Sequence, residues 1–179
     1  IKLDSDPKDF IQTFTYRWYE PNTHRLVTTA FYGSGDANWT YATAPTYETY
    51  ANRPTASGAT CLVTRYDYAG GRLEKVRDPK GLIVRYGYDD AGRTVKVEEQ
   101  DADQNVERVT LTQYDGRSNV VKQVADLDKD GVVDDGDDQV TTYTYADGHN
   151  ASLVTRVQYP DGDAVDDNVE FTYNLDGTV

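Results

Sequence analysis

The sequence predicts an all-β protein built as an array of antiparallel β-hairpins. Short segments of one pattern recur along the 179 residues, which is the signature of a repeat architecture. Apolar residues are only 37% of the chain and its mean hydropathy is −0.74, which is too little for a thick core. The 15 Tyr, 4 Phe and 2 Trp are nevertheless too many aromatic residues for a disordered chain. A thin, aromatic-rich β structure satisfies both observations.

The recurring segment has two aromatic residues at positions i and i+2, or a near relative of that pattern, then a turn rich in Asp, Asn or Gly, then a β-prone run. Residues i and i+2 of a strand lie on the same face, and the turn residues mark a tight reversal. Each copy is therefore a predicted hairpin, whose aromatic rings should form a cross-strand ladder in place of a conventional core. The aromatic residues at position i+2 of the six copies are Trp18, Tyr68, Tyr88, Tyr114, Tyr145 and Tyr173, and in the fourth copy Thr112 stands at position i.

Residues 1–179 are expected to form one such array, interrupted by an insertion at residues 33–62. The insertion follows the first hairpin and lacks the repeat pattern. Its aromatic residues could contact sugars or another subunit, or the insertion could pack on itself and cover a sheet edge. These aromatic residues are Trp39, Tyr41, Tyr47 and Tyr50.

Two arginines, Arg72 and Arg93, recur just after the turn glycines, where they can pack over the rings or pair with turn aspartates. The segments "YDYAGGRLEKVRDPKGLIVRYGYD" and "YGYDDAGR", within residues 66–97, closely resemble the YD (Rhs) repeats of bacterial Rhs and Tc toxin shells and of teneurins. This resemblance implies a curved or coiled sheet that forms the wall of a shell, tube or fibre.

The stretch "DLDKDGVVDDGD", residues 126–137, has the spacing of a calcium-binding loop. Alternate aspartates can converge on one hard cation, Gly131 allows a sharp turn, and Val133 can anchor the loop on the core. The aspartate at the last position resembles dockerin and thrombospondin-type calcium repeats, and the flanking sequences are typical of strands. The alternative is a solvated acidic turn. The predicted calcium ligands are Asp126, Asp128, Asp130, the carbonyl of Val132, Asp134 and Asp137.

Charge and cysteine content exclude several classes of protein. The chain carries 18 basic and 31 acidic residues, a net charge of −13, so nucleic acid and anionic membranes would be repelled. No apolar run is long enough to insert in a membrane. Cys61 is the only cysteine, so no internal disulfide can form. His24 and His149 fall in turns of different hairpins, and the sequence contains no catalytic motif. We therefore expect that the protein is not an enzyme.

These observations favour an extracellular or cell-surface structural protein: a secreted segment or repeating unit of a fibre, sheath or surface shell, stabilised by calcium. The alternative is the shell segment of an Rhs/Tc-type toxin that encloses a cargo, and a weaker one is a glycan-adhesive module. The tail "FTYNLDGTV" and the head "IKLDSDPKD" read as two halves of one hairpin. Neighbouring copies or flanking repeats of the same protein, joined head to tail, are therefore the expected partners.

Overall fold

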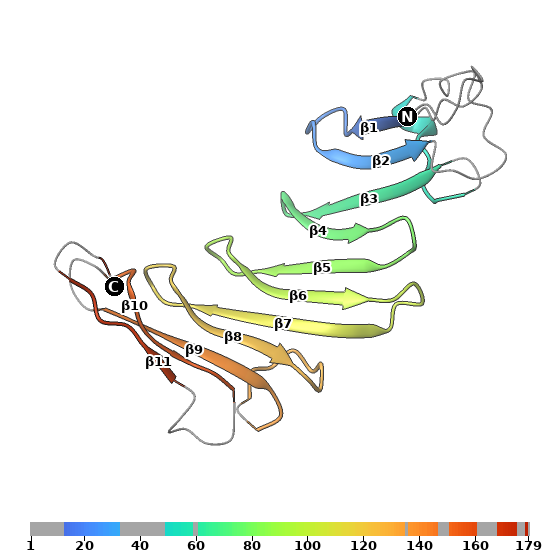
Figure 1. The fold of residues 1–179 in the computed structure, drawn as a ribbon. Coiled ribbons are helices and arrows are strands. Elements are labelled where there is room, and N and C mark those ends of the chain that lie inside the picture. The colour runs from blue at the N-terminus through green and yellow to red at the C-terminus, as the bar shows by residue number, and fades with distance from the viewer. Residues whose placement is uncertain are drawn as a thin grey trace, which may run out of the picture. The chain divides into compact units, whose positions relative to one another are not determined.

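The computed structural model describes residues 13–32, 49–58, 61–134, 136–146, 151–160, 168–174 and 178. These residues form eleven strands that follow one another in the sheet in chain order (Figure 1). The strands are β1 (Phe14–Tyr19), β2 (Leu26–Tyr32), β3 (Leu62–Ala69), β4 (Arg72–Arg77), β5 (Ile83–Tyr88), β6 (Thr94–Gln100), β7 (Val106–Tyr114), β8 (Val120–Asp126), β9 (Gln139–Tyr145), β10 (Val154–Gln158) and β11 (Asn168–Glu170). The predicted array of antiparallel hairpins is confirmed. Within these residues the helical content is a single 3₁₀ turn, η1 (Tyr50–Asn52).

The chain divides into two compact units, residues 1–84 with 101–104, and residues 85–100 with 105–179. In the first unit β1 pairs with β2, β2 with β3 and β3 with β4, all antiparallel. In the second unit antiparallel pairing continues from β6 through β11. Several hairpins contain a register shift, for example between Asp67 and Tyr68 and between Gln113 and Tyr114. Such bulges locally increase the twist of a strand pair.

The core of the first unit is small and centred on Trp18, which is 4% exposed. Trp18 packs with Ala30, Cys61 and Val63, and partly buried Tyr16, Val27, Tyr32 and Tyr50 contact this cluster. The Tyr16 ring lies 6.0 Å from that of Trp18 and meets Tyr32 edge-on at 5.7 Å. Aromatic packing of this kind supplies the burial that the short aliphatic residues lack.

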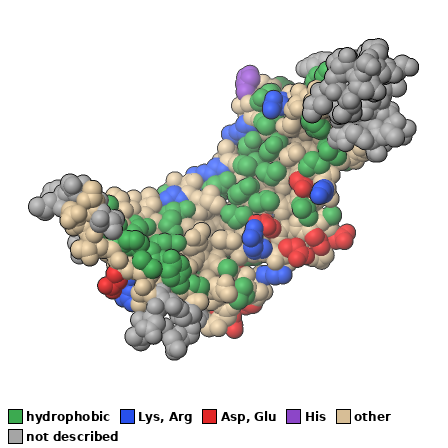
Figure 2. Space-filling model, viewed as in Figure 1, with side chains coloured by type: hydrophobic (Ala, Val, Ile, Leu, Met, Phe, Trp, Pro, Cys, Tyr) green, Lys and Arg blue, Asp and Glu red, His purple; other side chains and the backbone are tan. Residues whose placement is uncertain are grey.

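The core of the second unit consists of Val109, Leu111 and Val124, with Val106, Val133 and Val140 packed against them. In Figure 2 hydrophobic side chains lie open on the visible face of the sheet, and charged side chains gather toward its margins. Few of the described residues are therefore completely buried, as the low hydropathy predicts.

Several hairpins close with the same five-residue turn, which begins with an aspartate. At residues 89–93 the Asp89 N–H donates to the Arg93 carbonyl, the Gly92 N–H donates to the Asp89 carbonyl, and the Asp89 carboxylate accepts the Arg93 N–H. The fourth residue needs a positive φ, which favours glycine, and Gly92 has φ 84°. Ser118 takes the same place in the turn at residues 115–119 with φ 70°.

Tyrosine hydroxyls join four of the hairpins to the hairpins before them. In each of them the tyrosine at position i+2 of the repeat donates a hydrogen bond to the carbonyl of the first residue in the second strand of the preceding hairpin. This contact recurs four times with nearly constant length: Tyr68 to Leu26 at 3.0 Å, Tyr114 to Thr94 at 3.0 Å, Tyr145 to Val120 at 2.8 Å and Tyr173 to Val154 at 2.7 Å. We call it the tyrosine hook. It explains why the second aromatic residue of a repeat is usually tyrosine rather than phenylalanine.

Other groups of the turns reinforce the hooks. The Arg93 guanidinium lies 4.6 Å from the Tyr114 ring and donates to the Asp115 carbonyl at 3.0 Å. It also pairs with the Asp89 carboxylate at 2.7 Å, so both predicted partners of Arg93 are present. Burial, with the negative charge of Asp115 and the neighbouring Tyr143, raises the pKa of Tyr145, so its hydroxyl keeps the proton that the hook requires.

Replacing Tyr114 with phenylalanine is expected to lower the free energy of unfolding by about 0.5–1.5 kcal/mol, because it removes one hook and leaves the Thr94 carbonyl without its donor. Chemical denaturation of the purified chain measures this loss. Tyr143→Phe is the matched control, because the Tyr143 hydroxyl makes an exposed contact of 3.3 Å to the Gln123 side chain. Equal losses in the two variants would contradict a special role for the hook.

The insertion predicted at residues 33–62 is described only at residues 49–58, 61 and 62. Here Tyr50 packs against the first core, and the Arg53 guanidinium lies 4.2 Å from its ring. Trp39, Tyr41 and Tyr47 lie outside the described residues, as do His149 and residues 1–12 of the predicted head-to-tail contact. None of the described residues forms a helix with the length and hydrophobicity needed to span a membrane.

Candidate metal centre

The acidic loop connects β8 to β9 at one end of the second unit. Its first aspartate, Asp126, is the last residue of β8, and β9 begins at Gln139. Both flanks are strands, as the sequence predicts. Val133 reaches from the loop onto the core formed by Val109, Leu111 and Val124. The predicted hydrophobic anchor is thus in place, and it fixes the loop against the sheet.

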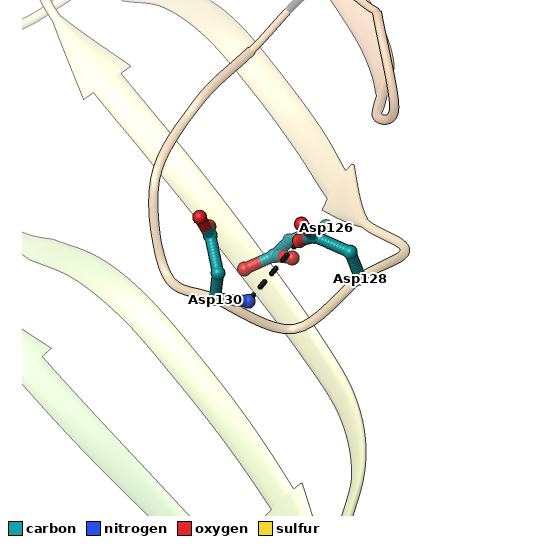
Figure 3. A group of neighbouring side chains, drawn as sticks. All are labelled: Asp126, Asp128 and Asp130. Carbon is teal, nitrogen blue, oxygen red and sulfur yellow. Dashed lines mark hydrogen bonds between the residues drawn. The ribbon is translucent and has the colours of Figure 1, made fainter.

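Three of the predicted ligands come together in the loop. Carboxylate oxygens of Asp126, Asp128 and Asp130 lie within 4.8 Å of one another (Figure 3). Asp126 is only 3% exposed, whereas Asp128 and Asp130 are open to solvent. Oxygen atoms of carboxylates are the donors that hard cations such as calcium prefer, so the chemistry of this set fits that ion.

Backbone N–H groups hold the three carboxylates in this arrangement. The Asp126 carboxylate accepts hydrogen bonds from the N–H groups of Lys129, at 2.6 Å, and Gly131, at 2.8 Å. Asp128 accepts from the Asp130 N–H at 3.1 Å, which is the contact drawn in Figure 3. Gly131 has φ 83°, which satisfies the predicted need for glycine at this turn. The first half of the loop therefore turns around the buried carboxylate of Asp126.

The carboxylates also repel one another. The N–H of Asp130 favours the charged form of Asp128, but burial, the Asp126 side chain and the negative charges of Asp130 and Asp126 together outweigh it and raise the pKa of Asp128. A bound cation would reverse this effect, because it neutralises the charges that raise the pKa.

The other predicted ligands lie apart from this group. The Asp134 carboxylate accepts the N–H of Asp137 at 2.9 Å, and neither residue belongs to the cluster of three. Val132 is 58% exposed, and its N–H donates to the Asp130 carboxylate at 2.7 Å. The loop thus gathers its first half around one point, while its second half is occupied by internal hydrogen bonds.

Sequence reasoning missed Asp138. Its carboxylate accepts the N–H groups of Leu127 and Asp134, both at 3.1 Å, and so ties the two ends of the loop together. The sequence signal for Asp138 is weak, because four aspartates lie close together at the end of the loop and the calcium-loop spacing selects Asp137 as the last ligand. Lys129 of the loop donates from its ammonium to the Val106 carbonyl at 2.9 Å, and the Lys96 ammonium lies beside Gly131.

The fold and the loop together define a class of protein: a meander of similar β-hairpins joined in series, in which most described turns are short and the acidic loop between β8 and β9 is longer. Residues 66–106 match the family described as RHS Repeat. These residues are therefore RHS-repeat sequence, and the resemblance stated for residues 66–97 is confirmed. No curated protein matches the sequence.

Two solved structures show the same fold. The crystal structure of TcdB2-TccC3-Cdc42 matches 93% of the chain with a TM-score of 0.55 and 16% identity, and that of TcdB2-TccC3 matches 90% with a TM-score of 0.51 and 14% identity. The matched parts are only 8% and 9% of those chains. At this sequence identity the structural similarity establishes the fold and does not establish the function.

Proposed function

We propose that this chain is a wall segment of an Rhs/Tc-type shell that encloses a cargo. The observation that carries the proposal is the serial arrangement of hairpins, four of them hooked to the hairpin before, together with the RHS-repeat sequence at residues 66–106. A single sheet with little buried core gains stability as more hairpins are added, which suits a wall made of many repeats.

The comparisons favour this shell over the fibre that sequence reasoning placed first. Two structures that share the fold are those of TcdB2-TccC3, one of them with Cdc42. A shell segment also gives the repeats of the same protein as natural neighbours, because each hook needs a carbonyl of the preceding hairpin. Secretion and the absence of catalysis remain predictions that accompany this proposal.

Electron microscopy of the longest natural polypeptide that contains these residues tests the proposal. We expect discrete hollow particles, in which a flanking segment resists protease until the particle is opened by denaturant. Long filaments with an axial repeat built from this chain would contradict the shell and restore the fibre.

We also propose that residues 126–137 bind one calcium ion. The proposal is supported by the three converging carboxylates, the positive φ of Gly131 and the anchoring of Val133. In this proposal Asp126, Asp128 and Asp130 hold the ion, and the Val132 carbonyl, Asp134 and Asp137 complete its coordination after the second half of the loop rearranges. The ion would replace mutual repulsion by attraction and stiffen the connection between β8 and β9.

A further inference from the structure

A second site lies in the first unit, away from the acidic loop. A pocket of about 470 Å³ opens where the turn between β1 and β2, the segment after η1, and β3 meet. This volume falls within the range of small-molecule sites, which is roughly 300–1,000 Å³. Three arginines from these segments line it: Arg25, Arg53 and Arg65. The arginines of the pocket outnumber its two acidic residues, Glu20 and Asp67, although the chain as a whole has a net charge of −13.

Two of the arginines are held by aromatic rings. The Arg53 guanidinium lies 4.2 Å from the Tyr50 ring and uses one N–H to bind the Tyr50 carbonyl at 2.8 Å. The Arg25 guanidinium lies 5.5 Å from the ring of Tyr68. A ring positions a guanidinium without neutralising its charge, and a guanidinium has five N–H donors. Both groups therefore keep donors and charge for a ligand.

The acidic residues of the pocket have partners of their own. The Asp67 carboxylate lies 2.9 Å from the Lys75 ammonium and 3.5 Å from the Arg65 guanidinium. The Glu20 carboxylate accepts a hydrogen bond from the Thr23 hydroxyl. Among the described residues neither carboxylate forms an ion pair with Arg25 or Arg53, and each keeps lone pairs that can accept hydrogen bonds from a ligand hydroxyl.

We propose that this pocket binds an acidic sugar. Its carboxylate would lie between Arg25 and Arg53, because the planar guanidinium matches a carboxylate in two parallel hydrogen bonds. Its hydroxyls would donate to Glu20 and Asp67. An acidic peptide satisfies the arginines but brings further carboxylates against Glu20 and Asp67, whereas a sugar acid combines one anion with several hydroxyl donors. The site is independent of the shell role.

A ligand-observed NMR titration with glucuronate tests this site on the whole chain, with glucose and inorganic sulfate as separate arms. Glucuronate is expected to bind saturably, glucose is expected not to bind, and sulfate is expected to bind more weakly than glucuronate. Arg25→Gln and Arg53→Gln should each weaken glucuronate binding about tenfold or more, because each removes a charge-assisted hydrogen bond. Arg53→Lys should restore only part of the affinity, because lysine lacks the planar fork.

Arg117→Gln is the matched control, since Arg117 is an exposed turn arginine of the second unit and its loss changes the net charge equally. It should leave glucuronate binding unchanged, and every variant should still show one cooperative thermal transition, which establishes that it is folded. Absence of glucuronate binding, or equal weakening by Arg117→Gln, would overturn the proposal. Sulfate that binds as tightly as glucuronate would reveal an adventitious ion only and overturn it as well.

Discussion

Calcium is expected to raise the thermal midpoint of the chain, and Asp128→Ala is expected to abolish that rise. At a calcium concentration about a hundred times the dissociation constant, binding to the folded state raises the free energy of unfolding by about 2.7 kcal/mol. For a chain of this size the midpoint should rise by roughly 5–10 °C. Differential scanning calorimetry with calcium and with a chelator measures the shift, and isothermal titration gives the affinity, expected near ~10⁻⁴ to 10⁻³ M.

The control for this prediction is Asp90→Ala. Asp90 is an exposed aspartate in the turn at residues 89–93, outside the acidic loop, so its loss should leave the calcium shift intact. The shift should also shrink at acidic pH, because protons compete with calcium for Asp128, whose pKa is raised. An unchanged midpoint in the wild type, or a shift that survives Asp128→Ala, would refute the calcium site and leave a solvated acidic turn.

Trp18→Ala is expected to destabilise the first unit by about 3–5 kcal/mol, the usual cost of removing a buried tryptophan. Trp18 is 4% exposed and is the centre of the first core, where Ala30, Cys61 and Val63 are too small to fill the space that it would leave. Because small domains have only about 5–15 kcal/mol of total stability, this variant should lose much of it.

Urea denaturation followed by circular dichroism measures the effect, with Tyr19→Ala as the control. Tyr19 is the next residue of β1 and is 50% exposed, so its loss should change the free energy of unfolding by less than about 1 kcal/mol. A comparable loss in both variants would mean that β1 contributes through its aromatic content rather than through one buried ring.

The hairpins could be predicted from the sequence because their determinants are local. Aromatic residues two apart, as at Tyr66 and Tyr68, and an aspartate-led turn, as at residues 89–93, specify strand, face and reversal within a dozen residues. The tyrosine hooks could not be predicted. Their acceptors are backbone carbonyls, such as that of Thr94, which every residue possesses and which therefore leave no mark in the sequence. The place of Ser118 in a turn that favours glycine was equally hidden.

In the acidic loop, too, the locally determined part could be predicted from the sequence and the rest could not. Asp126, Asp128 and Asp130 alternate before a glycine, and the structure gathers them because that short segment dictates its own turn. The second half of the loop depends on competition among neighbouring aspartates for N–H groups on both sides of the loop. Asp138 takes the N–H groups of Leu127 and Asp134, and spacing alone could not decide between it and Asp137.

The tyrosine hook also bears on how such a chain can evolve. Because the donor is a side chain and the acceptor is a main-chain oxygen, the hydrogen bond between Tyr145 and Val120 does not depend on which side chain occupies the acceptor position. A hairpin that carries its own tyrosine can therefore follow any other hairpin of suitable length. Duplication, deletion or recombination of whole hairpins would preserve the hydrogen bonds between neighbouring hairpins. The number of hairpins in the wall can therefore change while each new neighbour is still bound by the same tyrosine contact.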